Sequence, residues 1–110
     1  MLEKLKNSVK DAMRAKDKLR TQTLRSILSD FNNAGIDKKG RDGLTQEVSS
    51  PSEYLDEAEM IKVIQGAAKR RLEAAEQYVA GDRPELAEKE NLELVILEEF
   101  LPKALSSEEL

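Results

Sequence analysis

Residues 81–102 read GDRPELAEKENLELVILEEFLP, and this stretch predicts the fold because it holds both a helix boundary and a complete helix. Gly81 suits the left-handed residue that follows a preceding helix, and Asp82 can cap the next one. Pro84 belongs in the first turn of that helix, where its missing N–H costs nothing, and Pro102 ends it. The apolar positions become dense toward the end, which we expect to be buried: Leu86, Leu94, Ile96, Leu97, Phe100 and Leu101.

Three further helices precede this stretch, and their apolar residues recur at steps of three and four. The first covers residues 2–16, and the second runs from Leu19 to Gly35, where we expect it to stop. The third begins at Asp56, which has Glu59 at capping-box spacing. Residues 36–54 lack a sustained period and predict a long, mobile loop. The expected core positions are Leu2, Leu5, Val9, Ala12, Met13, Leu19, Thr23, Leu24, Ile27, Leu28, Phe31, Ile61, Ile64, Ala68, Leu72, Ala75 and Val79.

The composition fits one small all-α domain with an aliphatic core, since 36% of the 110 residues are charged and only 4% are aromatic. The chain has no cysteine and no histidine, which excludes disulfides, thiolate metal sites and imidazole acid–base catalysis. A serine or threonine nucleophile would need a lysine or carboxylate base in a pocket, and no such set is visible. We therefore expect no metal, no cofactor and no catalytic residues. The chain shows no apolar run of signal-peptide or membrane-span length, so we expect a cytoplasmic protein without a membrane segment.

The net charge of −4 hides a strong asymmetry along the chain. Residues 1–41 carry eleven Lys/Arg against five Asp/Glu, whereas residues 42–68 carry one against six and residues 69–110 carry six against eleven. Such a basic end can attract phosphate if its side chains share a face. The alternative is that these residues line solvated helix surfaces.

Two basic clusters are candidates for phosphate binding, one around the turn between the first two helices and one in the third helix. The four aromatic residues are scattered singly, so stacking platforms for single-stranded bases are missing and only shape and phosphate recognition remain. The RNA-binding candidates are Lys16, Lys18, Arg20, Arg25, Lys69, Arg70 and Arg71.

Several motifs occur in a characteristic order over almost the whole chain. Ile64 and Gln65 precede KRR at residues 69–71, GDRPELAEKE at 81–90 and ILEEFLPKALSSEEL at 96–110. Residues 12–34, AMRAKDKLRTQTLRSILSDFNNA, form the matching opening. In this order and spacing the sequence resembles the GatB/YqeY family. The loop at 36–55 is longer than is usual in that family.

The resemblance implies an all-α fold with a four-helix N-terminal domain, here residues 1–105, followed by a three-helix C-terminal domain. Residues 106–110 would begin that second domain, which is otherwise missing, and Ser106 with Glu109 has the capping-box spacing of a helix start.

The resemblance also implies a function, because the family is related to the tail region of the B subunit of the glutamine-dependent Glu/Asp-tRNA amidotransferase. That tail helps to hold tRNA, while the chemistry belongs elsewhere in the enzyme. By resemblance the chain is a tRNA-associated accessory module, catalogued with carbon–nitrogen ligases that use glutamine as amide donor, and its partner is tRNA or a tRNA-charging or amidating enzyme. Two alternatives remain open: a protein–protein adaptor without RNA binding, and an amidotransferase with its own catalytic cleft.

Overall fold

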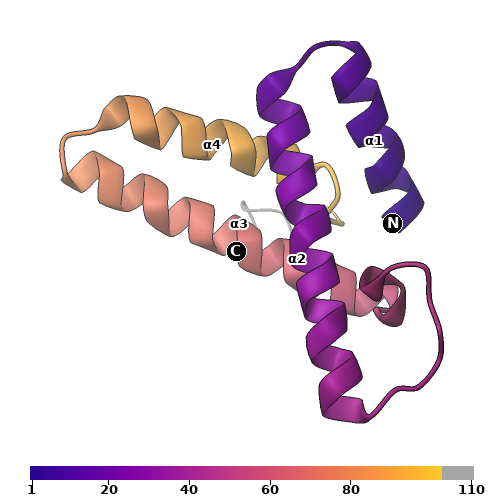
Figure 1. The fold of residues 1–110 in the computed structure, drawn as a ribbon. Coiled ribbons are helices and arrows are strands. Elements are labelled where there is room, and N and C mark those ends of the chain that lie inside the picture. The colour runs from indigo at the N-terminus through magenta and orange to yellow at the C-terminus, as the bar shows by residue number, and fades with distance from the viewer. Residues whose placement is uncertain (103–110) are drawn as a thin grey trace.

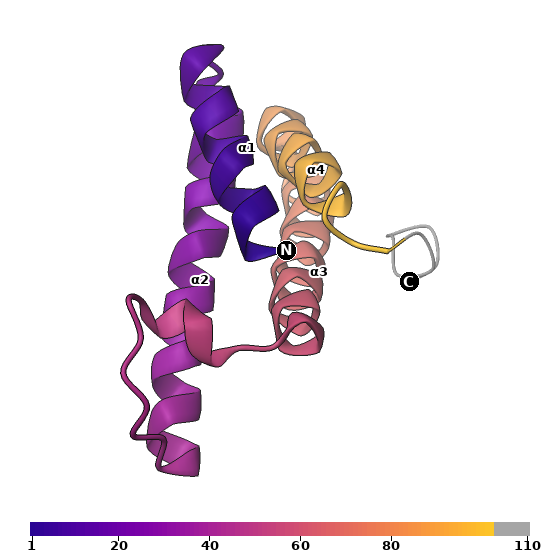
Figure 2. The same cartoon turned by 90° about the vertical axis from the view of Figure 1, so that its right-hand side faces the viewer.

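The fold is all-α, as the sequence predicted, and consists of two packed layers of two helices each. A computed structural model describes residues 1–102, which contain α1 (Leu2–Arg14), α2 (Lys18–Asp42), a short 3-10 helix η1 (Pro51–Tyr54), α3 (Glu57–Ala80) and α4 (Pro84–Glu98). The pairs α1–α2 and α3–α4 are both antiparallel hairpins (Figure 1). The long helix α2 crosses the α3–α4 hairpin (Figure 1) and contacts both of its helices, and the two hairpins lie side by side as layers (Figure 2). The helix start expected at residues 106–110 lies outside the described residues.

The core forms where α2 meets the α3–α4 hairpin and α1 closes one side. Phe31 of α2 is fully buried, and Phe100 follows the end of α4 with 5% exposure. The density of apolar residues near the end of α4 therefore marks the core, as the sequence predicted. The remaining members of this cluster are Leu5, Val9, Leu24, Ile27, Leu55, Met60, Ile64, Ala67, Ala68, Leu94, Ile96, Leu97 and Leu101. Within residues 1–102, no helix combines the length and the apolar character that crossing a bilayer would need.

The end of α2 differs from the sequence prediction. Gly35 does not stop the helix but is buried in its interior, and α2 continues to Asp42 before Gly43 takes the left-handed conformation with φ +64°. A Cβ atom added to Gly35 would lie 1.9 Å from the carbonyl oxygen of Pro51. Gly35 is thus a packing glycine that lets η1 lie against α2.

The expected loop at residues 36–54 is accordingly much shorter, because its first seven residues are helical and its last four form η1. Hydrogen bonds fix this segment to α2 and to itself. The amide of Ser52 donates to Asn32 Oδ1 at 3.1 Å, and the hydroxyl of Tyr54 donates to the carbonyl of Gln46 at 2.7 Å. Between α2 and α3, only residues 43–50 and 55–56 lie outside a helix.

The junction between α3 and α4 also departs from the prediction by one residue. Gly81 has an ordinary φ of −89°, and Asp82 takes the left-handed conformation with φ +59° instead. The amides of Asp82 and Arg83 close the end of α3 by donating to the carbonyls of Val79 and Tyr78. Asp82 therefore ends α3 rather than capping α4. Pro84 does occupy the first turn of α4, as predicted.

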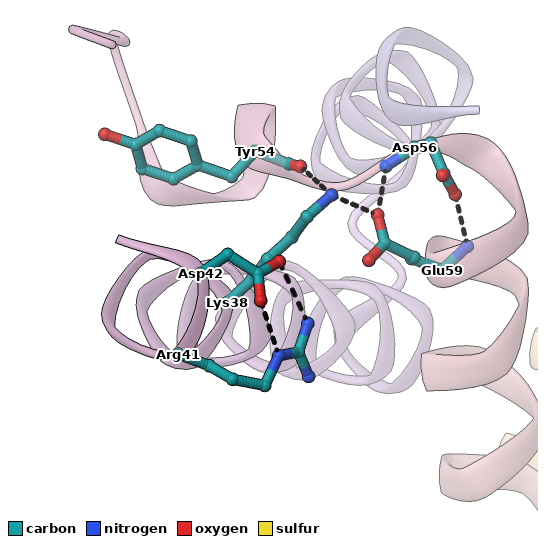
Figure 3. A network of polar contacts seen from close by, with 6 residues as sticks. All are labelled: Lys38, Arg41, Asp42, Tyr54, Asp56 and Glu59. Carbon is teal, nitrogen blue, oxygen red and sulfur yellow. Dashed lines mark hydrogen bonds and ion pairs between the residues drawn. The ribbon is translucent and has the colours of Figure 1, made fainter. Parts of the chain in front are cut away.

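Lys38 ties α2, η1 and α3 together (Figure 3). Its Nζ donates to the carbonyl of Tyr54 at 2.8 Å and to Glu59 Oε1 at 2.6 Å. Glu59 belongs to the predicted capping box: its carboxylate accepts from the amide of Asp56 at 2.9 Å, and its own amide donates to Asp56 Oδ1 at 2.8 Å. The backbone hydrogen bond from Asp56, followed by the hydrogen bond from Lys38, lowers the pKa of Glu59 below its ordinary value of 4.5. Close by, the Arg41 guanidinium lowers the pKa of Asp42 in the same way.

We expect the stability of the domain to fall on acidification partly through Glu59. Its pKa is lower in the folded than in the unfolded chain, so its contribution is complete above about pH 4.5 and disappears as the pH falls through the lowered pKa. Glu59→Gln should lower the melting temperature at neutral pH and flatten its decline below pH 4.5. Circular dichroism melts across pH 3–7 measure both effects. Glu73→Gln, at an exposed site of the same helix, should leave the acid decline as steep as in wild type, and an equal flattening in both variants would exclude the role of Glu59.

Candidate RNA-binding site

The turn between α1 and α2 carries two basic residues, Lys16 and Lys18, and the first of them has a strained backbone conformation. Lys16 has φ +57°, a left-handed conformation that glycine usually occupies. The amide of Lys16 donates to the carbonyl of Met13 and the amide of Asp17 to that of Ala12, which closes α1 in a Schellman motif. Asp17 then caps α2, since its carboxylate accepts from the amide of Arg20 at 3.0 Å. The chain thus reverses in three residues, with Lys16 and Lys18 exposed on either side of Asp17.

A shallow hollow of about 490 Å³ lies at this turn. Arg25 comes from the second turn of α2 and holds its Nη2 3.3 Å from the sulfur of Met13. Three of the seven candidate cations therefore gather at one place. The lining residues are Met13, Lys16, Asp17, Lys18, Thr21, Gln22 and Arg25.

The electrostatics of the hollow favour an anion. It has three cationic side chains against the single carboxylate of Asp17, which is already engaged with the backbone of α2. The first turn of α2 adds the partial positive charge of a helix N-terminus. Lysine ammonium groups and an arginine fork are the side chains that proteins use to bind phosphate. The hollow is therefore suited to the backbone of a nucleic acid.

Arg20 follows the same turn in sequence but makes a different contact. Its Nη1 and Nη2 donate to the two carboxylate oxygens of Glu99 at 2.6 and 3.0 Å. This bidentate pair joins the start of α2 to the end of α4, and the hydrogen bond to Glu99 raises the pKa of Arg20. Arg20 thus has a structural partner, whereas Lys16, Lys18 and Arg25 face the hollow.

The three consecutive basic residues at positions 69–71 of α3 point in three directions, because consecutive helical residues are separated by about 100°. Arg71 is directed inward: it bonds Glu93 Oε1 at 3.3 Å, the carbonyl of Ala67 at 3.1 Å and the hydroxyl of Ser26 at 3.3 Å. Arg70 is 65% exposed and lies 3.4 Å from Asp30. Lys69 lines a separate hollow that also contains two glutamates. The run KRR therefore does not form one basic surface.

Met13 is a site residue that the periodicity placed in the core. It is 50% exposed, because Ala12 takes the inward position at the end of α1 and its neighbour must point elsewhere. The only indication in the sequence that Met13 is exposed was its position next to Ala12, because two consecutive helical residues cannot both face the core. Over residues 1–102, no group of three or more carboxylates comes together in a way that could hold a metal ion.

Comparison with protein families decides what kind of chain this is. The model of the YqeY-like protein family matches residues 2–110. The chain belongs to the YqeY-like protein family. Similar proteins are known in yeasts: Altered inheritance of mitochondria protein 41, mitochondrial, of Kluyveromyces lactis is 36% identical over 96 residues, which are 87% of this chain and 45% of that protein. The protein of the same name from Lachancea thermotolerans is 32% identical over 97 residues, 88% of this chain and 46% of its own length. This YqeY-like chain therefore spans a little under half the length of the relatives it matches.

These relatives correct one sequence-based prediction. We predicted a cytoplasmic location because no targeting segment was visible, but the matched proteins, including a third from Candida glabrata at 29% identity, are named as mitochondrial. The prediction is wrong by this comparison, since the proteins that this YqeY-like chain matches carry mitochondrial names. The absence of a visible targeting segment was a poor basis for predicting the location, because targeting segments are separate from the folded domain.

Proposed function

We propose that this chain is an RNA-binding accessory module that acts on tRNA or beside a tRNA-charging or amidating enzyme. The observation that carries the proposal is the hollow at the α1–α2 turn, where Lys16, Lys18 and Arg25 come together around a helix N-terminus. The resemblance to the tail of the amidotransferase B subunit supplies the class of RNA. The proposal assigns binding to this surface, and no bond-forming step.

The mode of binding follows from the side chains available. Two lysines and an arginine can follow a phosphate backbone without reading sequence, and the exposed Met13 offers an apolar contact to a ribose or a base. Phe31 and Phe100 are buried in the core, so neither offers a stacking surface. The module would therefore recognise the shape and the phosphates of a folded RNA. In this proposal residues 1–105 are one domain, and the second helical domain implied by the resemblance would extend the RNA-contacting surface.

Charge reversal at the turn should remove most of the RNA affinity. For the double variant Lys16→Glu, Lys18→Glu we expect binding of bulk tRNA to weaken at least about tenfold at low salt, because two phosphate contacts become repulsive. The slope of log affinity against log salt should fall by about 1–2, since about 0.7–0.9 is expected for each phosphate contact that is lost. Fluorescence anisotropy with labelled tRNA over a salt series measures both quantities.

A matched control separates the site from the overall charge of the protein. Lys62→Glu, Lys89→Glu changes the net charge by the same amount at two exposed positions that lie outside the hollow. We expect its affinity to stay within about twofold of wild type, apart from a weak long-range effect. Equal losses in the two double variants would reject the α1–α2 turn as the binding site, and undetectable binding by wild type at low salt would reject the RNA-binding function.

The left-handed backbone conformation of Lys16 allows a second variant to be tested in the same tRNA-binding assay. Lys16→Gly should raise stability by up to about 1.5 kcal/mol, the difference between roughly 1–2 kcal/mol of left-handed strain and roughly 0.5–1 kcal/mol of glycine entropy. It should nevertheless weaken tRNA binding, because it removes one cation. Asp82→Gly relieves the same strain at the other Schellman turn and should leave affinity unchanged. Unchanged affinity in Lys16→Gly would exclude a contact between this lysine and RNA.

A further inference from the structure

The α3–α4 hairpin carries most of the large apolar side chains that the described residues leave exposed. Val79 is 65% exposed, Val95 61%, Leu92 49% and Leu86 39%, and outside this hairpin only Met13 and Ile36 are comparable. The sequence pattern had placed Val79 and Leu86 in the core. Of these four residues, Val79 lines the hollows described next.

Two hollows lie next to each other along α3. One of about 610 Å³ is lined by Gln65, Gly66, Lys69, Leu72, Glu73 and Glu76. The other, of about 310 Å³, is lined by Leu72, Ala75, Glu76, Val79 and Asn91. They share the lining residues Leu72 and Glu76 and so are neighbours on α3 between Gly66 and Val79; together we call them the α3–α4 groove. Gly66 and Arg70 also line a hollow shared with α2, so the Gly66 end of the groove borders α2, whereas its Val79 end lies beside Asn91 of α4.

Among residues 1–102, no backbone or core side chain packs closely against Gly66. A Cβ atom added there would meet only the flexible end of Arg70, at 3.9 Å, whereas one added to Gly35 would overlap backbone. Glycine is a poor residue for the middle of a helix, but it lets another backbone approach closely. The groove thus has a notch at one end and the apolar side chains of Leu72, Ala75 and Val79 along the rest.

The length and charge of the groove define what would fit it. From Gly66 to Val79 it runs about 20 Å, the length of about four helical turns. Its lining has two carboxylates, Glu73 and Glu76, and one cation, Lys69. On α4, Glu88 precedes the lining residue Asn91 by three positions, so the two share a helix face. An acidic border around an apolar strip is complementary to a helix with an apolar stripe and basic flanks.

We propose that the α3–α4 groove binds a basic amphipathic helix of a protein partner. The apolar stripe of that helix packs on Leu72, Ala75 and Val79, its backbone passes close to Gly66, and its lysines or arginines face Glu73, Glu76 and Glu88. The groove shares no residue with the hollow at the α1–α2 turn. The same molecule can therefore hold an RNA and a protein helix together.

The test uses the whole chain and a displayed library of peptides about 14 residues long, which matches about 20 Å of helix. All members carry Leu, Ile, Val, Met or Ala at helical spacing, and the flanking positions are free to be Lys or Glu. We expect the selected peptides to be enriched in Lys at the flanks. Binding should shift the amide NMR signals of Gly66, Leu72, Val79 and Asn91. Gly66→Leu and Val79→Ser should each weaken it at least fivefold, while Ile36→Ser, at an equally exposed apolar position of α2, should not change it.

Selection of no binder, no Lys enrichment, or shifts confined to other surfaces would overturn the inference. Concentration-dependent self-association that Val79→Ser removes would assign the groove to a second copy of the chain instead. Both groove variants should bind tRNA as wild type does. A loss of tRNA affinity in them would show that the groove takes RNA, which contradicts this inference while leaving RNA binding by the chain intact.

Discussion

Gly35→Ala should destabilise the domain by about 2–4 kcal/mol, at or above the upper end of what overpacking a well-packed core usually costs. The added Cβ would lie 1.9 Å from the carbonyl oxygen of Pro51 and 2.5 Å from its carbonyl carbon. Both atoms are backbone, so no side chain can rotate away to make room. Either η1 moves off α2, which breaks the bond between Ser52 and Asn32, or α2 shifts against the core. Urea unfolding followed by circular dichroism gives the change in free energy.

Gly40→Ala is the matched control, since it makes the same chemical change in the same helix. Nothing lies within 4 Å of a Cβ atom at Gly40, so the variant should keep or gain stability, by up to about 1 kcal/mol from helix propensity. A Gly35→Ala protein as stable as Gly40→Ala would show that η1 does not pack on α2 as described and that the glycine at position 35 has no packing role.

The four helices were predictable because each carries its own local signals. The capping box of Asp56 and Glu59, the proline in the first turn of α4 and the spacing of apolar residues all act within a few residues of the chain. Such signals do not depend on the rest of the fold. This is why the all-α class and most core positions followed from sequence alone.

The end of α2 was not predictable in the same way. Glycine both ends helices and allows close packing, and the letters NNAG do not distinguish the two roles. What decides at Gly35 is the carbonyl of Pro51, sixteen positions further along the chain. At the α3–α4 junction a similar ambiguity moved the left-handed residue from Gly81 to Asp82. At Gly35, a long-range contact thus selects among locally allowed conformations.

The candidate site shows the same division between local and distant information. Lys16 and Lys18 flank one turn, so sequence alone placed them together, and Arg25 is two turns further along the same helix. The ion pairs that engage Arg20 and Arg71 join residues 79 and 22 positions apart. A run of basic residues does not reveal which of them forms an ion pair with a carboxylate far away in the sequence. Arg20 and Arg71 are therefore engaged in ion pairs that charge counting did not reveal.

Arg71→Ala should cost about 2–4 kcal/mol, because it leaves a largely buried carboxylate without its partner. The side chains of Arg71 and Glu93 are both only 14% exposed, and the guanidinium also bonds the hydroxyl of Ser26 and the carbonyl of Ala67. The change thus removes contacts between α3 and both α2 and α4. Urea unfolding measures the loss, and Lys69→Ala, one residue away and exposed, should change stability by less than about 0.5 kcal/mol.

A double-mutant cycle identifies the source of that cost. Removing Glu93 as well should restore at least about 1 kcal/mol relative to the sum of the single changes, because the unpaired carboxylate is then gone. Purely additive losses would mean that the pair contributes nothing and that Arg71 acts through its other bonds. The result also determines how RNA binding by Arg71 variants is interpreted. If Arg71 supports the fold, Arg71→Ala binds tRNA as wild type does under conditions where it stays folded, and it loses binding only in step with its helical signal.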